Sequence, residues 1–357
     1  MSHEPPLSRL SSLRSSIGGL LGKESFAHLP TPVREFPLRL PAGRRRLTVK
    51  LDNLTGDLYG GNKVRKLEYI LHRARQKHCE RIATFGTVAS HHALATALYA
   101  KHLGYPCICF LSHQTPTAAA SETLKMHLKL GTSLVRFGGG YEKRLRILRQ
   151  HLWGQHPWVV PSGGTSWLGA FGFVCAGIEL AEQIADGLLS PPDRLYVAAG
   201  TMGTAAGLAL GLALAELKTE VHAVRVSHTF ICNEEGLARL LAKTARMMHR
   251  LDRAIPRDLA ERTSIRLRHE FFAGGYARTD DEIEDAIRFA RDELDLQLEG
   301  TYTGKAMAAI RRDLSGGDAS NSQFLFWNTF NSVPLSVDKS ASIDRNALPE
   351  EFLRYVS

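Results

Sequence analysis

The segment LYGGNKVRKLEYIL, residues 58–71, places a lysine where a helix is expected to begin. Two glycines and an asparagine precede Lys63, and Leu67, Ile70 and Leu71 follow it at helical spacing. The positive end of the helix dipole disfavours a cation at this position. One interpretation is a helix start followed by a basic, solvated face. The other is a lysine that works as a neutral amine or forms a Schiff base.

A second turn, GTVASHHALATALYA, joins an apolar run that ends at Gly86 to a helical pattern that follows Ser90. A serine in this place is a favoured N-cap, because its hydroxyl can accept from a free amide of the first helical turn. The amides left over at such a terminus can also hold a carboxylate. The sequence leaves both interpretations of Ser90 open.

A third turn lies in VAAGTMGTAAGLALGLALA, residues 197–215, where an apolar run meets Gly-Thr-Met-Gly-Thr and then an apolar helix. Small residues allow backbone amides to approach a phosphate, and the helix dipole adds attraction. Neither a P-loop Gly-Lys-Ser/Thr nor a GxGxxG pattern is present. The turn therefore indicates a site for a single phosphate.

The fourth turn, LEGTYTGKAMAAI, places Tyr302 and Thr303 before a helix that carries Lys305. Lys305 is most simply a surface residue, and Tyr302 is either a core tyrosine or a site residue. The upstream segment FFAGGYART offers a second glycine-flanked tyrosine, Tyr276. A lysine nucleophile together with a phosphate site suggests pyridoxal phosphate, which needs an amine, a phosphate cradle and a partner for its pyridine nitrogen.

These turns are positioned by an alternation of helical patterns and short apolar runs from about residue 64 to 330, which predicts an α/β fold of parallel strands with helices on both faces. Ligands in such sheets bind beyond the carboxyl ends of the strands. The predicted strands are 81–86, 105–111, 133–137, 157–161, 194–200, 221–226 and 324–327. The predicted helices are near 64–77, 91–104, 121–131, 141–153, 168–187, 203–218, 233–250, 280–294 and 304–314.

The 357 residues suggest two domains or one large α/β unit. No apolar run approaches about 18 residues, so no membrane span is expected. The first 30 residues lack the apolar core of a secretory signal and are expected to form a loose arm. The net charge of +9 is scattered apart from the run AGRRRL, read as a solvated strand edge, which favours an anionic small molecule over nucleic acid.

The cysteine and histidine patterns argue against disulfides and metals. Five cysteines include no CxxC pair, which favours reduced thiols and a cytoplasmic protein. The 15 histidines show no HExxH or Cys/His spacing, so no metal site is expected. Residues 315–322 are predicted to be a surface loop, and the C-terminal tail is predicted to carry a short helix near its end.

Five segments together resemble one known family: LTGDLYGGNKVRKLEYIL, GTVASHHALATALYAKHLGY, PSGGTSWLGAFGFVCAGIEL, AAGTMGTAAGLALGLAL and YTGKAMAAI. The family is that of D-cysteine desulfhydrase and 1-aminocyclopropane-1-carboxylate (ACC) deaminase, among the tryptophan-synthase-β-like, fold type II pyridoxal-phosphate enzymes. The resemblance covers about residues 48–330. It implies two open-sheet α/β domains of parallel strands. The expected parts are an arm and the start of the large domain (1–79), a small domain (80–174), and the remainder of the large domain with a tail (175–357).

The resemblance also implies roles for particular residues in binding pyridoxal 5′-phosphate and a small amino acid. The implied catalytic residues are Lys63, which would carry the Schiff base, and Ser90, Tyr276 and Tyr302. The substrate carboxylate would be held by Ser90, His91 and His92. The cofactor would contact Lys63, Asn62, His91, Gly200, Thr201, Met202, Gly203 and Thr204, and Thr303 or Thr329 would face its pyridine nitrogen.

The chain departs from the family pattern at several of these positions. His91 stands where the family has an asparagine that touches the 3′-oxygen of the cofactor. Met202 stands where glycine is usual, and Phe330 lies in NTFN where the family has HTGG. GTYT stands where DPVY is usual. These departures bear on the substrate and the reaction rather than on the cofactor.

The implied activity is deaminating breakdown of a small amino acid, either by β-elimination of the D-cysteine type or by ring opening of the ACC type. Racemisation or β-replacement in a specialised biosynthetic pathway is the alternative on the same cofactor. A homologue that binds the cofactor without turnover is a further alternative. The expected assembly is a homodimer, with no nucleic-acid or membrane partner.

Overall fold

The computed structural model describes residues 7–40, 43–316, 322–334 and 345–356. The chain divides into a larger unit, Met1–Tyr69 with Thr165–Ser332, and a smaller unit, Ile70–Gly164 with Val333–Ser357. Each boundary lies ten residues before the one expected from the sequence, and the C-terminal segment belongs to the smaller unit. The first boundary falls inside helix α2, Lys63–Gln76, where a continuous helical pattern gives no sign of a domain end.

The larger unit is built on a six-stranded sheet with the order β1-β2-β10-β7-β8-β9. The strands are β1 Val33–Leu40, β2 Gly43–Lys50, β7 Arg194–Ala199, β8 Glu220–Arg225, β9 Ile265–Arg268 and β10 Phe324–Trp327. All neighbours pair in parallel except β1 and β2. The α/β class with parallel strands is confirmed. Strand β2 begins in the run AGRRRL, which the sequence indicates as a solvated strand edge, whereas β1 and its antiparallel pairing with β2 are not predicted.

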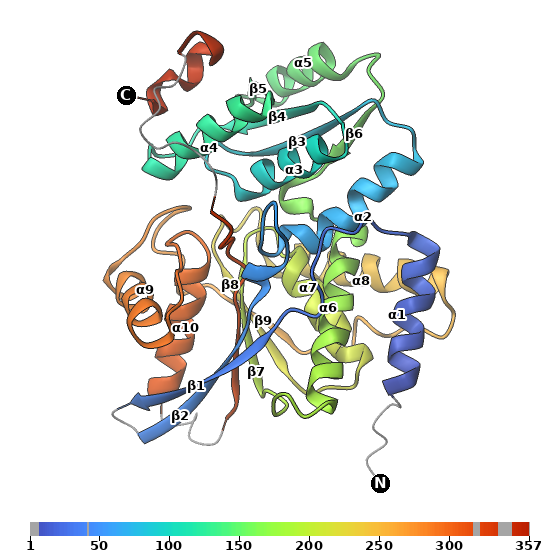
Figure 1. Cartoon of the computed structure of the whole chain (residues 1–357), viewed down its shortest axis with the longest axis vertical. Coiled ribbons are helices and arrows are strands. Elements are labelled where there is room, and N and C mark those ends of the chain that lie inside the picture. The colour runs from blue at the N-terminus through green and yellow to red at the C-terminus, as the bar shows by residue number, and fades with distance from the viewer. Residues whose placement is uncertain (1–6, 41–42, 317–321, 335–344, 357) are drawn as a thin grey trace. The chain divides into compact units, whose positions relative to one another are not determined.

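Helices cover both faces of this sheet (Figure 1). On one face α9 Asp281–Leu294 and α10 Thr303–Ser315 pack on a core to which Tyr196 and Ala198, alternate residues of β7, contribute. On the other face lie α6 Trp167–Ala185, α7 Gly203–Leu214 and α8 Glu234–Leu251. Burial on both faces explains why the strands read as continuous apolar runs in the sequence.

Helix α6 is the most apolar long element of the larger unit. Among the described residues it alone is long and apolar enough to cross a membrane by length and composition, with a mean hydropathy of 1.4. Within the protein, 83% of that stretch is buried. Its burial is that of a core helix.

The first helix, α1 Leu7–Leu21, corrects the prediction of a loose N-terminal arm. Leu10, Leu13 and Ile17 recur at helical spacing and are buried. On the same helix, the guanidinium of Arg14 lies 2.8 Å from the carboxylate of Glu182 in α6. The apolar spacing of this segment is the signal that its serines and arginine masked. Residues 1–6, and most of the loop predicted at 315–322, lie outside the described residues.

The smaller unit contains a four-stranded parallel sheet with the order β5-β4-β3-β6. The strands are β3 Arg81–Thr87, β4 Cys107–Ser112, β5 Ser133–Arg136 and β6 Pro157–Val160. Helix α5 Tyr141–Leu152 packs on one face, and α3 His91–His102 and α4 Ala118–Leu130 lie on the other (Figure 1). A short 3-10 helix over Glu350–Tyr355 ends the described chain.

Candidate active site

The turn before Lys63 is shaped by contacts with the segment that follows β10. Gly61 has a φ of +83°, and a Cβ there would lie 2.5 Å from the carbonyl oxygen of Thr329. The amide of Asn62 donates to that same oxygen over 3.3 Å. The amide of Gly60 donates to Oδ1 of Asn331 over 2.6 Å. Glycine is therefore required at position 61, and helix α2 begins immediately after this turn, at Lys63.

The amine of Lys63 is held by Asn62. Its Nζ donates to Oδ1 of Asn62 over 2.6 Å, and Nδ2 of Asn62 donates to Oγ1 of Thr204 over 3.0 Å. The Nζ also lies 6.0 Å from the centroid of the Tyr302 ring. Asn62 thus connects the lysine to the start of helix α7, where the sequence predicts a phosphate site.

The charge state of Lys63 is set by its surroundings. Burial lowers the pKa of Lys63 to about 8, and the negative charge of Glu299 opposes this shift. The two basic residues that follow it, Arg65 and Lys66, are only 1% and 2% exposed. The interpretation of this stretch as a basic, solvated face is therefore wrong, because the basic side chains point into the protein.

The start of α7 has the features of a phosphate cradle. Met202 occupies the N-cap position with a φ of 63°, and its side chain does not cap the first amides of the helix. A Cβ on Gly203 would lie 2.7 Å from Oγ1 of Thr165 and 3.0 Å from Nζ of Lys66. The hydroxyls of Thr165 and Thr201 are 2.6 Å apart. Free amides, hydroxyl groups and an amine gathered at a helix N-terminus fit a phosphate group.

Lys66 is a site residue that the sequence did not single out. Burial lowers the pKa of Lys66 well below its usual value, and the nearby amine of Lys63 lowers it further. An anion bound at the start of α7 would favour the charged form of this amine. The only sequence signal was its position three residues after Lys63, which places both lysines on the same face of α2.

The structure brings the two predicted tyrosines together. The hydroxyl oxygens of Tyr276 and Tyr302 lie 2.5 Å apart, and their rings meet edge to face at 6.0 Å. A Cβ on Gly200, in the predicted phosphate loop, would lie 3.5 Å from the Tyr302 ring. Burial holds the pKa of Tyr302 well above its usual value, so the phenol stays protonated and can donate a proton.

Glu299 organises the start of α10, where Tyr302 and Thr303 lie. Its Oε1 accepts from the amides of Tyr302 and Thr303, both over 2.9 Å, and its Oε2 accepts from the amide of Thr301 over 2.7 Å. The hydroxyl of Thr303 donates to Oε1 of Glu299 over 3.2 Å. Of the two threonines proposed to face a pyridine nitrogen, Thr303 is thus already engaged in this cap, whereas Thr329 is half-buried.

The prediction of Lys305 as a surface residue is wrong. Its side chain is fully buried, and its Nζ donates to the carbonyl oxygens of Phe272 over 2.7 Å and Gly275 over 3.1 Å. These carbonyls belong to the loop that carries Tyr276. A lysine near a helix start reads as solvated in the sequence, and only the tertiary fold shows that carbonyl groups surround it.

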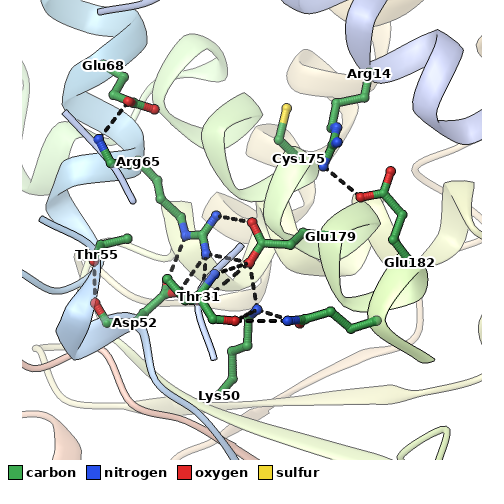
Figure 2. Close-up of polar contacts among 12 residues, drawn as sticks. Arg14, Thr31, Lys50, Asp52, Thr55, Arg65, Glu68, Cys175, Glu179 and Glu182 are labelled. Carbon is green, nitrogen blue, oxygen red and sulfur yellow. Dashed lines mark hydrogen bonds and ion pairs between the residues drawn. The ribbon is translucent and has the colours of Figure 1, made fainter. Parts of the chain in front are cut away.

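Helix α2 is fixed in the larger unit by a buried network of charges centred on Arg65 (Figure 2). Nε and Nη2 of Arg65 donate to the two oxygens of Asp52 over 3.0 and 2.8 Å, and Nη1 donates to Oε2 of Glu179 over 2.9 Å. Nζ of Lys50 donates to Oε1 of Glu179 over 2.6 Å. The charges of two cations and two carboxylates thus compensate each other inside the protein. Arg65, at the centre of this network, lies two residues after Lys63 on the same helix.

The three residues predicted to hold a substrate carboxylate lie at the carboxyl end of β3, in the smaller unit. Ser90 is the N-cap of α3, and its hydroxyl accepts from the amide of Ala93 over 3.2 Å. His91 is the first residue of α3 and is half-buried. The structural role of Ser90 is therefore present, and a further role in binding stays a proposal.

His92 is directed into the core of the smaller unit. It is 4% exposed, and its Nε2 lies 3.0 Å from Oγ1 of Thr84. The Thr84 hydroxyl donates its proton to the carbonyl oxygen of Val160 over 3.1 Å, so Nε2 of His92 is the donor to Thr84. His92 thereby supports the first turn of α3 from beneath.

The sequence of this chain matches the model of one known protein family. The model of a family described as "Pyridoxal-phosphate dependent enzyme" matches residues 25–327. That range includes Lys63, the start of α7, both tyrosines and the Ser90 turn. The match covers most of the sequence from which the site was built.

Several solved structures have a fold similar to that of this chain. The crystal structure of an ACC deaminase homologue is similar with a TM-score of 0.73 and 26% identity, over 92% of this chain and 95% of that chain. An L-serine ammonia-lyase from the fungus Rhizomucor miehei has a TM-score of 0.59 and 18% identity, over 86% and 95% of the two chains. Serine racemase from Dictyostelium discoideum has a TM-score of 0.59 and 16% identity, over 92% and 99%. The last two similarities concern the fold alone.

Proposed function

Because the chain belongs to the family of pyridoxal-phosphate-dependent enzymes, we propose that it breaks down a small amino acid with release of ammonia. The leading version is β-elimination of the D-cysteine type, and ring opening of the ACC type is the second. The observation that carries the proposal is the half-buried Lys63 amine, joined through Asn62 to the start of α7. Similarity to an ACC deaminase homologue supports deamination.

The residues of the larger unit fit the cofactor. Lys63 offers an amine that burial makes a better nucleophile at mildly alkaline pH. The start of α7 and the amine of Lys66 fit its phosphate, and Thr329 is the proposed partner of its pyridine nitrogen. When bound, pyridoxal phosphate supplies an electron sink for charge that develops at the α-carbon of an amino acid.

The remaining roles follow from protonation state and position. Lys63 is the proposed base for the α-proton, because a lysine with a pKa of about 8 can both accept and return a proton near neutral pH. Tyr302, held protonated by burial and paired with Tyr276, is the proposed acid for a leaving group or an opening ring. Ser90 and the first turn of α3 are proposed to bind the carboxylate.

A screen of D- and L-amino acids for keto acid, ammonia and sulfide tests this proposal, with D-cysteine and ACC included. Keto acid and ammonia in equal amounts are expected from one or a few small substrates. In the Tyr302→Phe variant we expect the bound cofactor to be retained while turnover falls by about 10²- to 10⁴-fold.

Three outcomes of the screen would replace deamination. Inversion of configuration without ammonia would indicate a racemase, and exchange of a β-substituent would indicate β-replacement. A protein that binds the cofactor but turns over nothing would be the homologue without turnover. The homodimer and the cytoplasmic location expected from the sequence stay predictions.

A further inference from the structure

The C-terminal segment of the smaller unit is anchored by aromatic side chains. In the 3-10 helix Glu350–Tyr355, Phe352 is fully buried and Tyr355 is 5% exposed. The ring of His113, which follows β4, lies 5.8 Å from the ring of Tyr355 and 6.2 Å from that of Phe352. Two aromatic side chains of this helix are therefore part of the packed interior of the smaller unit.

The hydroxyl of Tyr355 uses its whole hydrogen-bonding capacity on the loop after β4. It donates to the carbonyl oxygen of Gln114 over 2.9 Å and accepts from the amide of Gln114 over 3.0 Å. Nδ1 of His113 lies 3.0 Å from the same oxygen. A phenol has one proton to donate, so Nδ1 of His113 is the second donor to it. Both backbone groups of Gln114 are thus fixed by one side chain.

Gln114 in turn contacts the turn that leads into α3. Its side-chain Oε1 accepts from the amide of Ala89 over 3.1 Å. Ala89 immediately precedes Ser90, whose own amide donates to the carbonyl oxygen of Thr87 over 3.0 Å. A continuous set of hydrogen bonds therefore runs from Tyr355 through Gln114 to the residue before Ser90.

We propose that Tyr355 is a positioning residue for the amino-acid substrate: through Gln114 it holds the 87–90 turn, and with it Ser90, in the form that binds the carboxylate. The role of Ser90 in this statement depends on the proposed function. The hydrogen bonds among Tyr355, Gln114 and Ala89 do not depend on the proposed function, and all of them lie within the smaller unit.

Two properties make this set of contacts a determinant of binding rather than of overall folding. Tyr355→Phe keeps the buried ring and removes only the hydroxyl, so the packing against His113 and Phe352 is preserved. Ser90 keeps its own bond to the amide of Ala93, so α3 stays capped without Tyr355. What is lost is the support that Gln114 gives to the amide of Ala89.

The test compares Tyr355→Phe and Gln114→Leu with a control, Tyr141→Phe, whose side chain lies on α5 of the same unit and is 80% exposed. With D-cysteine as the probe, we expect KM to rise about 3- to 10-fold in the first two variants, as for the loss of the one neutral hydrogen bond between Gln114 and Ala89, with a smaller change in kcat. The visible absorbance of the bound cofactor should not change. The double variant should be no worse than Gln114→Leu alone, because both changes break the same connection.

Hydrogen exchange at the amide of Ala89 provides a readout that needs no substrate. Exchange should be faster in Tyr355→Phe and Gln114→Leu than in the native chain and in Tyr141→Phe. Unchanged exchange at Ala89 in Tyr355→Phe, or KM effects that add in the double variant, would overturn the proposal. Faster exchange in a protein that acts on no amino acid would instead refute the proposed function and leave the positioning of the turn established.

Discussion

Burial, rather than the position at the helix start, sets the protonation of Lys63. The dipole of α2 opposes a cation there, but the larger effect is desolvation, which lowers the pKa to about 8. The negative charge of Glu299 partly offsets this lowering of the pKa. Without it, the amine would be neutral over more of the physiological pH range. The balance between these two effects gives an amine that exchanges protons in the working range of an enzyme.

The rate at which the cofactor-free protein takes up pyridoxal phosphate should follow this titration. Only the neutral amine reacts with an aldehyde, so the rate should rise with pH with a midpoint near 8. Glu299→Gln should move the midpoint to lower pH, because the charge that favours the ammonium form is removed. Stopped-flow absorbance across the range from about pH 6 to 10 measures both. A midpoint near the ordinary lysine value of 10.5 would contradict the assignment.

Ser90 has two possible roles that one variant separates. If the residue only caps α3, Ser90→Ala should cost roughly 1 kcal/mol of unfolding free energy and leave turnover intact. If it also binds the substrate, as proposed, turnover should fall well beyond what this loss of stability explains, while the cofactor stays bound. Melting temperature and activity measured on one preparation decide between them, and full activity in a destabilised Ser90→Ala would remove Ser90 from the site.

At the level of residues, the turns containing Lys63, Gly203 and Tyr302 could be found from the sequence because small residues there leave a local pattern. Lys66 and Lys305 could not be found. A lysine on a helix normally extends into solvent. Lys66 is instead buried near Gly203, and the amine of Lys305 is bound by the carbonyl groups of Phe272 and Gly275, all far away in the sequence. The direct contact between Tyr276 and Tyr302 is equally a product of the tertiary fold.

Helix α2 is the element that carries the proposed nucleophile, and its position depends on the buried charge network. Burial alone would raise the pKa of Glu179, but the charges of Arg65 and Lys50 lower it to about 2. The carboxylate therefore stays ionised wherever the protein functions. Trp327 joins the network, since its indole nitrogen donates to Asp52 over 2.8 Å.

Arg65→Met should therefore be strongly destabilising. It removes the two hydrogen bonds that Asp52 and the two that Glu179 accept from Arg65 in a dry interior, and breaking such a pair costs about 3–5 kcal/mol. Urea unfolding measures this cost, with Arg73→Met, an exposed position on the same helix, as the control. A loss below about 1 kcal/mol would show that the network behaves like an exposed ion pair and does not fix α2.

Strands and helices with a clear pattern of apolar residues could be predicted, and those in which polar residues interrupt the pattern could not. The runs that became β3, β4, β7, β8 and β10 are continuous and apolar because both faces are buried. Each of the strands β1, β2 and β9 carries exposed arginine, which hides the alternation that marks a half-buried strand: Arg34 in β1, Arg44 and Arg46 in β2, and Arg266 in β9. Helix α1 was missed for a similar reason, since serine and glycine dilute its apolar face.

At the level of the whole molecule, the two-unit organisation follows from two separate sheets. The length of the chain left one or two units open, and only the family resemblance implied two sheets. The positions of the boundaries did not follow, because α2 continues across the first one without a break. The assignment of the last residues to the smaller unit depends on Phe352 and Tyr355, two aromatic residues in a tail that otherwise reads as polar. A few buried side chains thus decide to which unit a terminal segment belongs.

Lys63, rather than one of the buried lysines, is the residue proposed to bind pyridoxal phosphate. Lys66 and Lys305 are the informative competitors, because burial lowers the pKa of each of these amines as well. The most direct measurement is borohydride reduction of the yellow, cofactor-loaded protein, followed by proteolysis and peptide mass analysis. We expect a pyridoxyl group on the peptide containing Lys63, and no label after Lys63→Ala. A label on Lys66 or Lys305, or a colourless protein that cannot be reconstituted, would contradict it.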